Sequence, residues 1–153
     1  MIISPTSPNV GVMFPVVAFA KDRTKEFCLN ARELTRCSPA ALSHGYYEGL
    51  KCVAANGVRF TAKSARKIGT IKHWWSPPVF FTLISVQLDV EDAGIVAVEE
   101  LKQAFRRVFS YDPYILPSLG SSMKELDGAL ALCNSHQDVA EWLSKLKPIG
   151  PRI

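Results

Sequence analysis

Apolar and polar residues alternate without interruption over residues 84–90, "ISVQLDV". The apolar members of this pattern are Ile84, Val86, Leu88 and Val90. A period of two residues places them on one side of a strand, because successive side chains of a strand point to opposite faces. The pattern therefore predicts a strand with one buried face over residues 84–90.

A second strand signal surrounds Asn56-Gly57. A two-residue type I′ turn needs a positive φ at both of its positions, and Asn-Gly is the pair that tolerates this best. This turn would join residues 50–55 with residues 58–63 as a hairpin. Pairing outward from the turn predicts a mostly apolar face made of Lys51, Val53, Ala55, Val58, Phe60 and Ala62. The opposite face is predicted to be half exposed and to consist of Leu50, Cys52, Ala54, Arg59, Thr61 and Lys63. We expect Phe60 and Ala62 to lie beneath the C-terminal helices, with the cations of the other face pointing outward.

The N-terminal part contains an apolar run over residues 10–20 that ends on Ala-Phe-Ala. A signal peptide is one interpretation of this run, although no Lys or Arg precedes it. The other interpretation is a flexible lead over residues 1–12 followed by a buried strand over residues 14–20. The segment "KEFCLN" then predicts a second short strand, so that the two strands form a hairpin.

The C-terminal part changes to helical spacing, with apolar residues at Val98, Leu101, Phe105 and Val108. This spacing predicts a helix over residues 98–109. Capping patterns that begin at Ser122 and Ser135 predict two further helices. A shorter helical turn is predicted after Ser38, because proline follows it in the first helical position and Gly45 provides a left-handed end.

Strands come first along the chain and helices last, an order that is typical of the α+β class. We expect a mostly antiparallel sheet, a short helical turn after the first strands, and two to three C-terminal helices packed on the sheet. The chain of 153 residues is 48% hydrophobic and 21% charged, which fits one domain that folds without disulfides or metal. That domain is expected over residues 13–148, with residues 149–153 as a tail. No segment is apolar over the length that a bilayer span requires.

The residues that carry most enzyme and metal chemistry are scattered along the chain. The four cysteines form no CxxC pair and have no histidine at ligand spacing, so neither a zinc site nor a thioredoxin-like motif is predicted. The nine glycines form no phosphate-binding loop. We therefore expect a cytoplasmic protein without catalytic residues, cofactors or metal, in a reducing compartment. An enzyme whose acid and base meet only in the folded chain stays open as an alternative.

The charged residues are distributed unevenly. Residues 51–75 carry six Lys or Arg, one His and two Trp without an acid, whereas residues 89–153 hold ten acids against seven bases. Three interpretations of the basic stretch are open: the solvated side of a sheet, a protein-binding surface, or a surface that binds phosphates and stacks bases on tryptophan. The candidate partner-binding residues are Lys51, Arg59, Lys63, Arg66, Lys67, Lys72, His73 and Trp74.

The order of motifs over residues 34–109 adds a family resemblance. The segment "GYYEGL" leads into the Asn-Gly hairpin, an aromatic-rich strand follows, and "VQLDVEDAGIVAVEELKQAF" connects that strand to the first long helix. In this succession the chain resembles small immunity proteins encoded beside bacterial polymorphic or contact-dependent toxins. The resemblance implies a non-catalytic inhibitor that binds one cognate toxin, and it carries over no catalytic residue. Because the hairpin is basic, a nuclease toxin is expected to contact the acidic C-terminal part instead. Nucleic-acid binding through residues 51–75 is the alternative function.

Overall fold

The computed structural model describes residues 2–5, 11–20, 25–76 and 79–146. The side chains of residues 72–81 are outside this description, and so is the tail expected at residues 149–153. The described chain has the predicted α+β fold, with a seven-stranded antiparallel sheet, two short helices between its strands and four helices after it.

The sheet has the strand order β1-β7-β6-β5-β2-β3, and β4 pairs with β7 beside β1. The strands are β1 (Ile2–Ile3), β2 (Val16–Phe19), β3 (Lys25–Cys28), β4 (Arg36–Cys37), β5 (Leu50–Ala54), β6 (Val58–Ser76) and β7 (Val79–Ile95). The predicted N-terminal hairpin is present, since β2 and β3 pair antiparallel.

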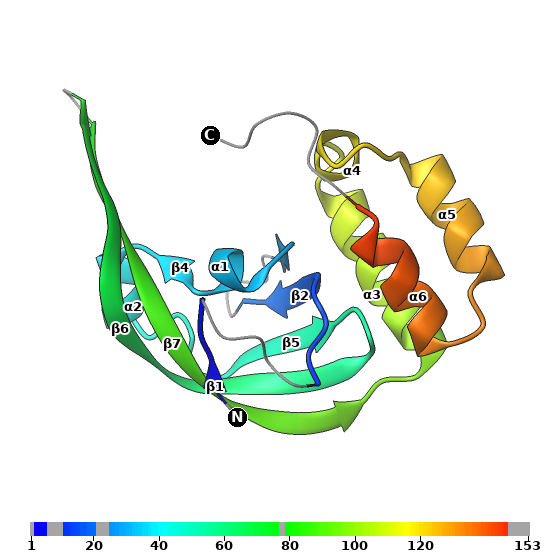
Figure 1. Ribbon diagram of the computed structural model, residues 1–153, viewed down its shortest axis with the longest axis horizontal. Coiled ribbons are helices and arrows are strands. Elements are labelled where there is room, and N and C mark those ends of the chain that lie inside the picture. The colour runs from blue at the N-terminus through cyan, green and yellow to red at the C-terminus, as the bar shows by residue number, and fades with distance from the viewer. Residues whose placement is uncertain (1, 6–10, 21–24, 77–78, 147–153) are drawn as a thin grey trace.

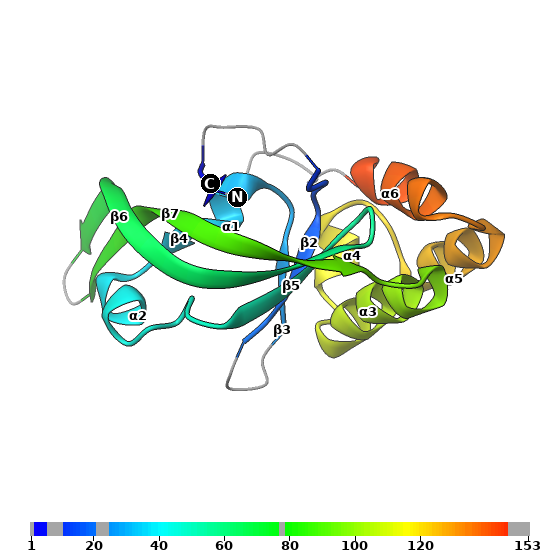
Figure 2. The ribbon, with the colours of Figure 1, turned by 90° about the horizontal axis from the view of Figure 1, so that it is seen from below.

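The helices are α1 (Ala31–Leu34), α2 (Pro39–Ser43), α3 (Val98–Tyr111), α4 (Ile115–Ser118), α5 (Met123–Leu132) and α6 (His136–Ser144). Helices α3 to α6 gather at one end of the sheet, whereas β6 and β7 extend away from them toward the other end (Figure 1 and Figure 2). The C-terminal helices therefore cover only part of the sheet.

Serine side chains begin three of the helices that the sequence predicted, whereas α3 begins after Ala97 without a side-chain cap. Ser38, Ser122 and Ser135 each accept a hydrogen bond from the backbone N–H three residues later, which satisfies an otherwise unpaired donor. Gly45 follows α2 with the expected positive φ, 72°. Helices α1 and α4 were not predicted, because four residues are too few to show a helical period.

The central hairpin forms, but the predicted register is wrong. Val53 lies opposite Arg59, so three residues, 55–57, connect the strands, and the predicted two-residue turn is absent. The last residue of this loop has a φ of 85°, as in three-residue loops that end in a glycine bulge. The predicted register would have placed the Lys51 ammonium group on the buried face of Phe60, which the observed register avoids.

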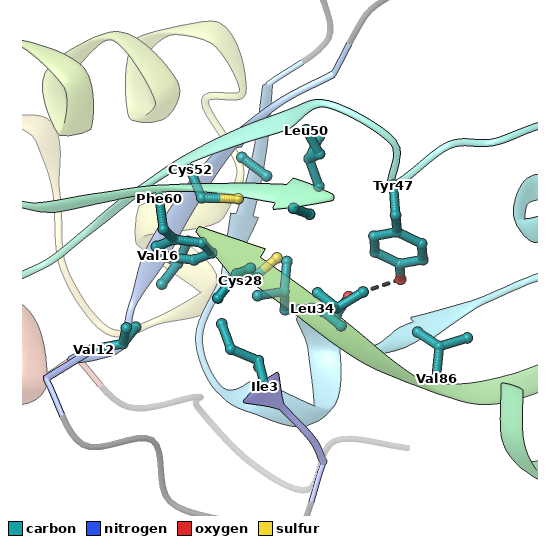
Figure 3. Close-up of a cluster of buried hydrophobic side chains, with 14 of the residues drawn as sticks. Ile3, Val12, Val16, Cys28, Leu34, Tyr47, Leu50, Cys52, Phe60 and Val86 are labelled. Carbon is teal, nitrogen blue, oxygen red and sulfur yellow. Dashed lines mark hydrogen bonds between the residues drawn. The ribbon is translucent and has the colours of Figure 1, made fainter. Parts of the chain in front are cut away.

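This one-residue difference also changes which core each side chain enters. Phe60 and Ala62 lie in a cluster formed with β1, β7 and the α1–α2 region (Figure 3), and not beneath the C-terminal helices as predicted. A second core cluster lies between the sheet and the C-terminal helices, and the sheet contributes Val17 and Val53 to it. The alternating residues of β7 are buried as predicted, and they line the first cluster: Ile84, Val86, Leu88 and Val90.

Tyr47 connects several elements of the first cluster. It is 2% exposed, and its hydroxyl group donates a hydrogen bond of 2.8 Å to the backbone oxygen of Leu34 at the end of α1 (Figure 3). The aromatic ring thus fixes the α2–β5 connection against α1, and the buried hydroxyl group has the partner that burial requires.

The N-terminal lead that the sequence predicted to be flexible is partly built into the fold. Ile3 lies opposite Leu88 in the β1–β7 pair and is fully buried. Val12 is also buried in the same cluster. Strand β1 was not predicted because two residues carry no periodic signal.

Strands β6 and β7 are far longer than predicted, at 19 and 17 residues. The pairing of β6 with β7 shifts register at four places, after Val58, Ala62, Lys67 and Thr70. Each bulge adds a residue on one strand and increases the local twist. These shifts also interrupt the period of two residues, which explains why the sequence pattern indicated a much shorter strand. The far ends of both strands form a curved ribbon that projects beyond the rest of the molecule (Figure 1).

Candidate functional site

The eight residues predicted to bind a partner do not form one surface. Lys51 and Arg59 lie near α3, Lys63 lies midway along the hairpin, and the other five lie on the projecting part of β6: Arg66, Lys67, Lys72, His73 and Trp74. Each of these three regions has a different electrostatic environment.

The ribbon arm is defined here as residues 65–76 of β6 and residues 79–88 of β7. Its outer part projects, whereas Ile84, Val86 and Leu88 of its inner part line the first cluster. Its sequence contains no Asp or Glu on either strand. Arg66 is exposed, and its Nη2 donates a hydrogen bond of 2.6 Å to Oε1 of Gln87 on the opposite strand. Lys67 is exposed too, and it lies opposite Val86. The two cations are thus accessible, and the arm itself holds no carboxylate, although Asp89, directly after it, borders a recess together with Arg66.

Two isoleucines of the ribbon arm are exposed beside these cations. Ile68 is 48% exposed and Ile71 is 38% exposed. Each is the extra residue of a register shift, since the pairing passes from Lys67 to Gly69 and from Thr70 to Lys72. Bulges change the direction in which a side chain points. The arm therefore presents aliphatic and cationic side chains together.

The outer end of the ribbon arm can be placed only by its backbone. Lys72 lies opposite Leu83, His73 opposite Thr82, and Trp74 opposite Phe81. The side chains of Lys72, His73, Trp74 and Phe81 are outside the described part of the structure. The register nevertheless continues the ribbon through this aromatic-rich stretch.

The middle of the hairpin carries more carboxylates than cations. Nζ of Lys63 lies 3.7 Å from Oε2 of Glu91, and both side chains are more than half exposed. Asp89 and Asp92 follow on the same stretch of β7, opposite Ser64 and Phe60. Lys63 therefore fits the solvated side of a sheet, because exposed ion pairs of this kind contribute only about 0 to 1 kcal/mol.

Lys51 and Arg59 border a cavity between the sheet and α3. The observed register puts both on the helix-facing side of the hairpin, whereas the predicted register put them on opposite faces. Glu100 and Arg107 of α3 complete the charged border. Glu100 and Arg107 were not predicted as site residues, because no local pattern connects a helix to a strand more than 40 positions away.

The cysteines are held in their neutral form. Burial raises the pKa of the Cys28 thiol, with a smaller contribution from the carboxylate of Glu26, and burial raises that of Cys52 to about 12. Burial also raises the pKa of Cys37, against an opposing hydrogen bond from Tyr47. These thiols are therefore protonated at neutral pH, which disfavours nucleophilic attack.

Neither ligand chemistry nor comparison with known proteins assigns a function. Among the described residues, no three His, Cys, Asp or Glu side chains are grouped so that they could hold a metal ion. None of the described helices combines the length and apolar character needed to cross a membrane. No protein-family model, curated protein or solved structure matches the chain.

Proposed function

We propose that the chain is a non-catalytic, cytoplasmic immunity protein of a bacterial toxin system, and that it neutralises one cognate toxin by direct binding through the ribbon arm. The observation that carries this proposal is that Ile68 and Ile71 are exposed directly after the exposed cations Arg66 and Lys67, on a ribbon whose sequence holds no Asp or Glu. Interface cores combine apolar side chains with arginine, and they are depleted of Asp and Glu. The motif order over residues 34–109, which resembles that of small immunity proteins, supports the same function.

The composition of the arm indicates the chemistry of its partner. Exposed cations accelerate encounter with a negatively charged surface, while buried apolar contacts slow dissociation. We infer a toxin surface that has acidic groups around an apolar patch. A toxin that acts on nucleic acid has a basic substrate groove, so it would meet the acidic C-terminal part of this chain and not the arm.

Co-expression with the product of the adjacent upstream gene tests the proposal. That product should arrest growth when expressed alone and should be tolerated when this chain is present. Substitution of Ile68→Ser with Ile71→Ser should accelerate dissociation of the complex about tenfold or more. The matched control is Ile95→Ser, because Ile95 is also an exposed isoleucine, at 68%, but lies outside the arm. A neighbouring product that is harmless, or that stays toxic beside this chain, would refute the proposal.

Nucleic-acid binding is the second candidate function, and the shape of the arm favours it. A two-stranded ribbon fits the major groove of DNA, and the arm has no carboxylate to repel phosphates. Electrophoretic shift of DNA and RNA at several salt concentrations separates the two functions. Phosphate binding should weaken steeply with salt and should depend on Arg66 and Lys67 but not on Ile68. Absence of a shift at micromolar protein would remove this candidate.

A further inference from the structure

The cavity beside α3 has an apolar floor and a cationic border. Its volume is about 190 Å³, and its floor includes Phe19, Val53 and Val96. Phe19 lies opposite Lys51, and Val53 lies opposite Arg59, so neighbouring rows of the sheet supply both apolar and cationic side chains. The opposite wall is α3, from which Glu100 and Arg107 border the cavity two turns apart.

The border carries three cations and one carboxylate. Among the residues that the structure describes, Lys51, Arg59 and Arg107 form no ion pair. Within this described part, the ion pairs join Lys63 with Glu91, Lys102 with Glu99, and Arg106 with Asp127. Unpaired cations around a recess favour an anionic ligand, because their fields add in the same small space. If these cations belonged only to the solvated face of a sheet, there would be no reason for them to surround an apolar recess.

The size of the cavity limits what can fill it. A dry cavity of about 150 Å³ accepts benzene, so the space beside α3 fits one compact apolar group and not an extended ligand. We infer that this cavity binds a carboxylate that carries a compact apolar body. The apolar body would lie against Phe19 and Val53, and the carboxylate would lie between Lys51, Arg59 and Arg107. This inference does not rest on the immunity function, since it concerns a different surface from the ribbon arm.

Two sources supply this chemistry. One is a free small organic acid, and the other is the last residue of a polypeptide, which combines a terminal carboxylate with one apolar side chain. Both need the same border of cations. They differ in the peptide group next to the carboxylate, which only the polypeptide terminus offers to Gln103 at the cavity border.

Titration of the full chain with three probes tests the inference. N-acetyl-leucine represents a polypeptide terminus, isocaproate has the same carbon skeleton without the acetamido group, and N-acetyl-leucine amide has no charge. Backbone amide shifts in an NMR spectrum should move saturably around Val53, Arg59 and Ala104 with the two acids and not with the amide. Tighter binding of N-acetyl-leucine than of isocaproate, by about tenfold, identifies a polypeptide terminus, and equal or reversed affinities identify a free acid. If neither acid causes saturable shifts at about 10 mM, or if the amide binds equally well, the inference is overturned.

Charge variants add a second test, because removal of a cation and removal of the carboxylate should change the affinity for the acids in opposite directions. Arg59→Gln and Arg107→Gln should each weaken binding of the acids about fivefold, whereas Glu100→Gln should strengthen it about threefold. The matched control is Lys124→Gln, an exposed cation on α5 that is outside the cavity and should change nothing. Unchanged affinity in the arginine variants, or weaker binding in Glu100→Gln, would refute the inference. Arg66→Gln on the ribbon arm should leave acid binding unchanged, so failure of the immunity function and failure of this site are separable.

Discussion

Gly57 offers the sharpest test of how the hairpin is docked against the helices. It has a φ of 85°, and its backbone oxygen accepts a hydrogen bond of 2.9 Å from the N–H of Val96. A methyl group at this position would overlap Cδ2 of His136 and would lie 3.1 Å from Nε2 of that ring. Nε2 of His136 lies 2.6 Å from the backbone oxygen of Val96, so it carries the proton and donates. Gly57→Ala therefore disturbs the contact between the loop and the start of α6.

The expected loss of stability has two parts. A left-handed backbone costs a residue with a Cβ about 1 to 2 kcal/mol. Displacement of the His136 ring would break its hydrogen bond to Val96, which costs about 0.5 to 1.5 kcal/mol more. We expect Gly57→Ala to lower the free energy of unfolding by about 1.5 to 3.5 kcal/mol. Urea unfolding followed by tryptophan fluorescence measures this change.

Two controls separate these parts. Gly94 has a φ of 97°, and a Cβ built there meets nothing within 4 Å, so Gly94→Ala should show the backbone part alone. In a His136→Ala background the ring is absent, and Gly57→Ala should then cost no more than Gly94→Ala. If Gly57→Ala and Gly94→Ala are equally destabilising, or if the double variant is additive, the ring does not press on position 57 and the reasoning is refuted.

The remaining predictions concern the core, the surface cations and the thiols. Phe60→Ala should lower the free energy of unfolding by about 3 to 5 kcal/mol, because Phe60 is fully buried, and a silent variant in urea unfolding would contradict its placement. Arg59→Ala and Lys63→Ala, at exposed positions, should leave the melting temperature nearly unchanged in calorimetry, and a large loss would show that these cations have buried partners. Stability should fall as the pH rises above about 9, because the unfolded chain releases the protons of Cys28 and Cys52 while the folded pKa values are raised. Urea unfolding at several pH values checks this sign, and stability that is constant up to pH 11 would contradict the burial of both thiols.

Much of the fold could be predicted because its signals are local. The alternation from Ile84 to Val90 identified a buried strand face, and the serine caps at Ser122 and Ser135 located two helices. In each case the residues that determine the structure are within a few positions of one another. Such signals do not require knowledge of what packs against the segment.

The hairpin register and the candidate site could not be predicted in this way. A two-residue turn and a three-residue loop both suit Asn56-Gly57, and the choice depends on which face the rest of the chain covers. The exposure of Ile68 depends on a bulge that no alternation reveals. The position of Arg107 on the same cavity as Arg59 depends on how α3 packs against the sheet. These features arise from tertiary packing, so a single sequence read for periodicity does not contain them.

Strand β6 has an open outer edge that bears on how the free molecule behaves at high concentration. Its pairing with β5 ends at Ala62, and from Lys63 onward β7 is its partner among the described strands. An unpaired edge offers N–H and C=O groups to any extended chain, and lysines and bulges on an edge hinder such pairing. Two arms that met edge to edge would bring their own cations together, and the register shifts would prevent a long ladder. Loss of Arg66 and Lys67 would therefore appear first as self-association of the free protein, before any change in its melting temperature.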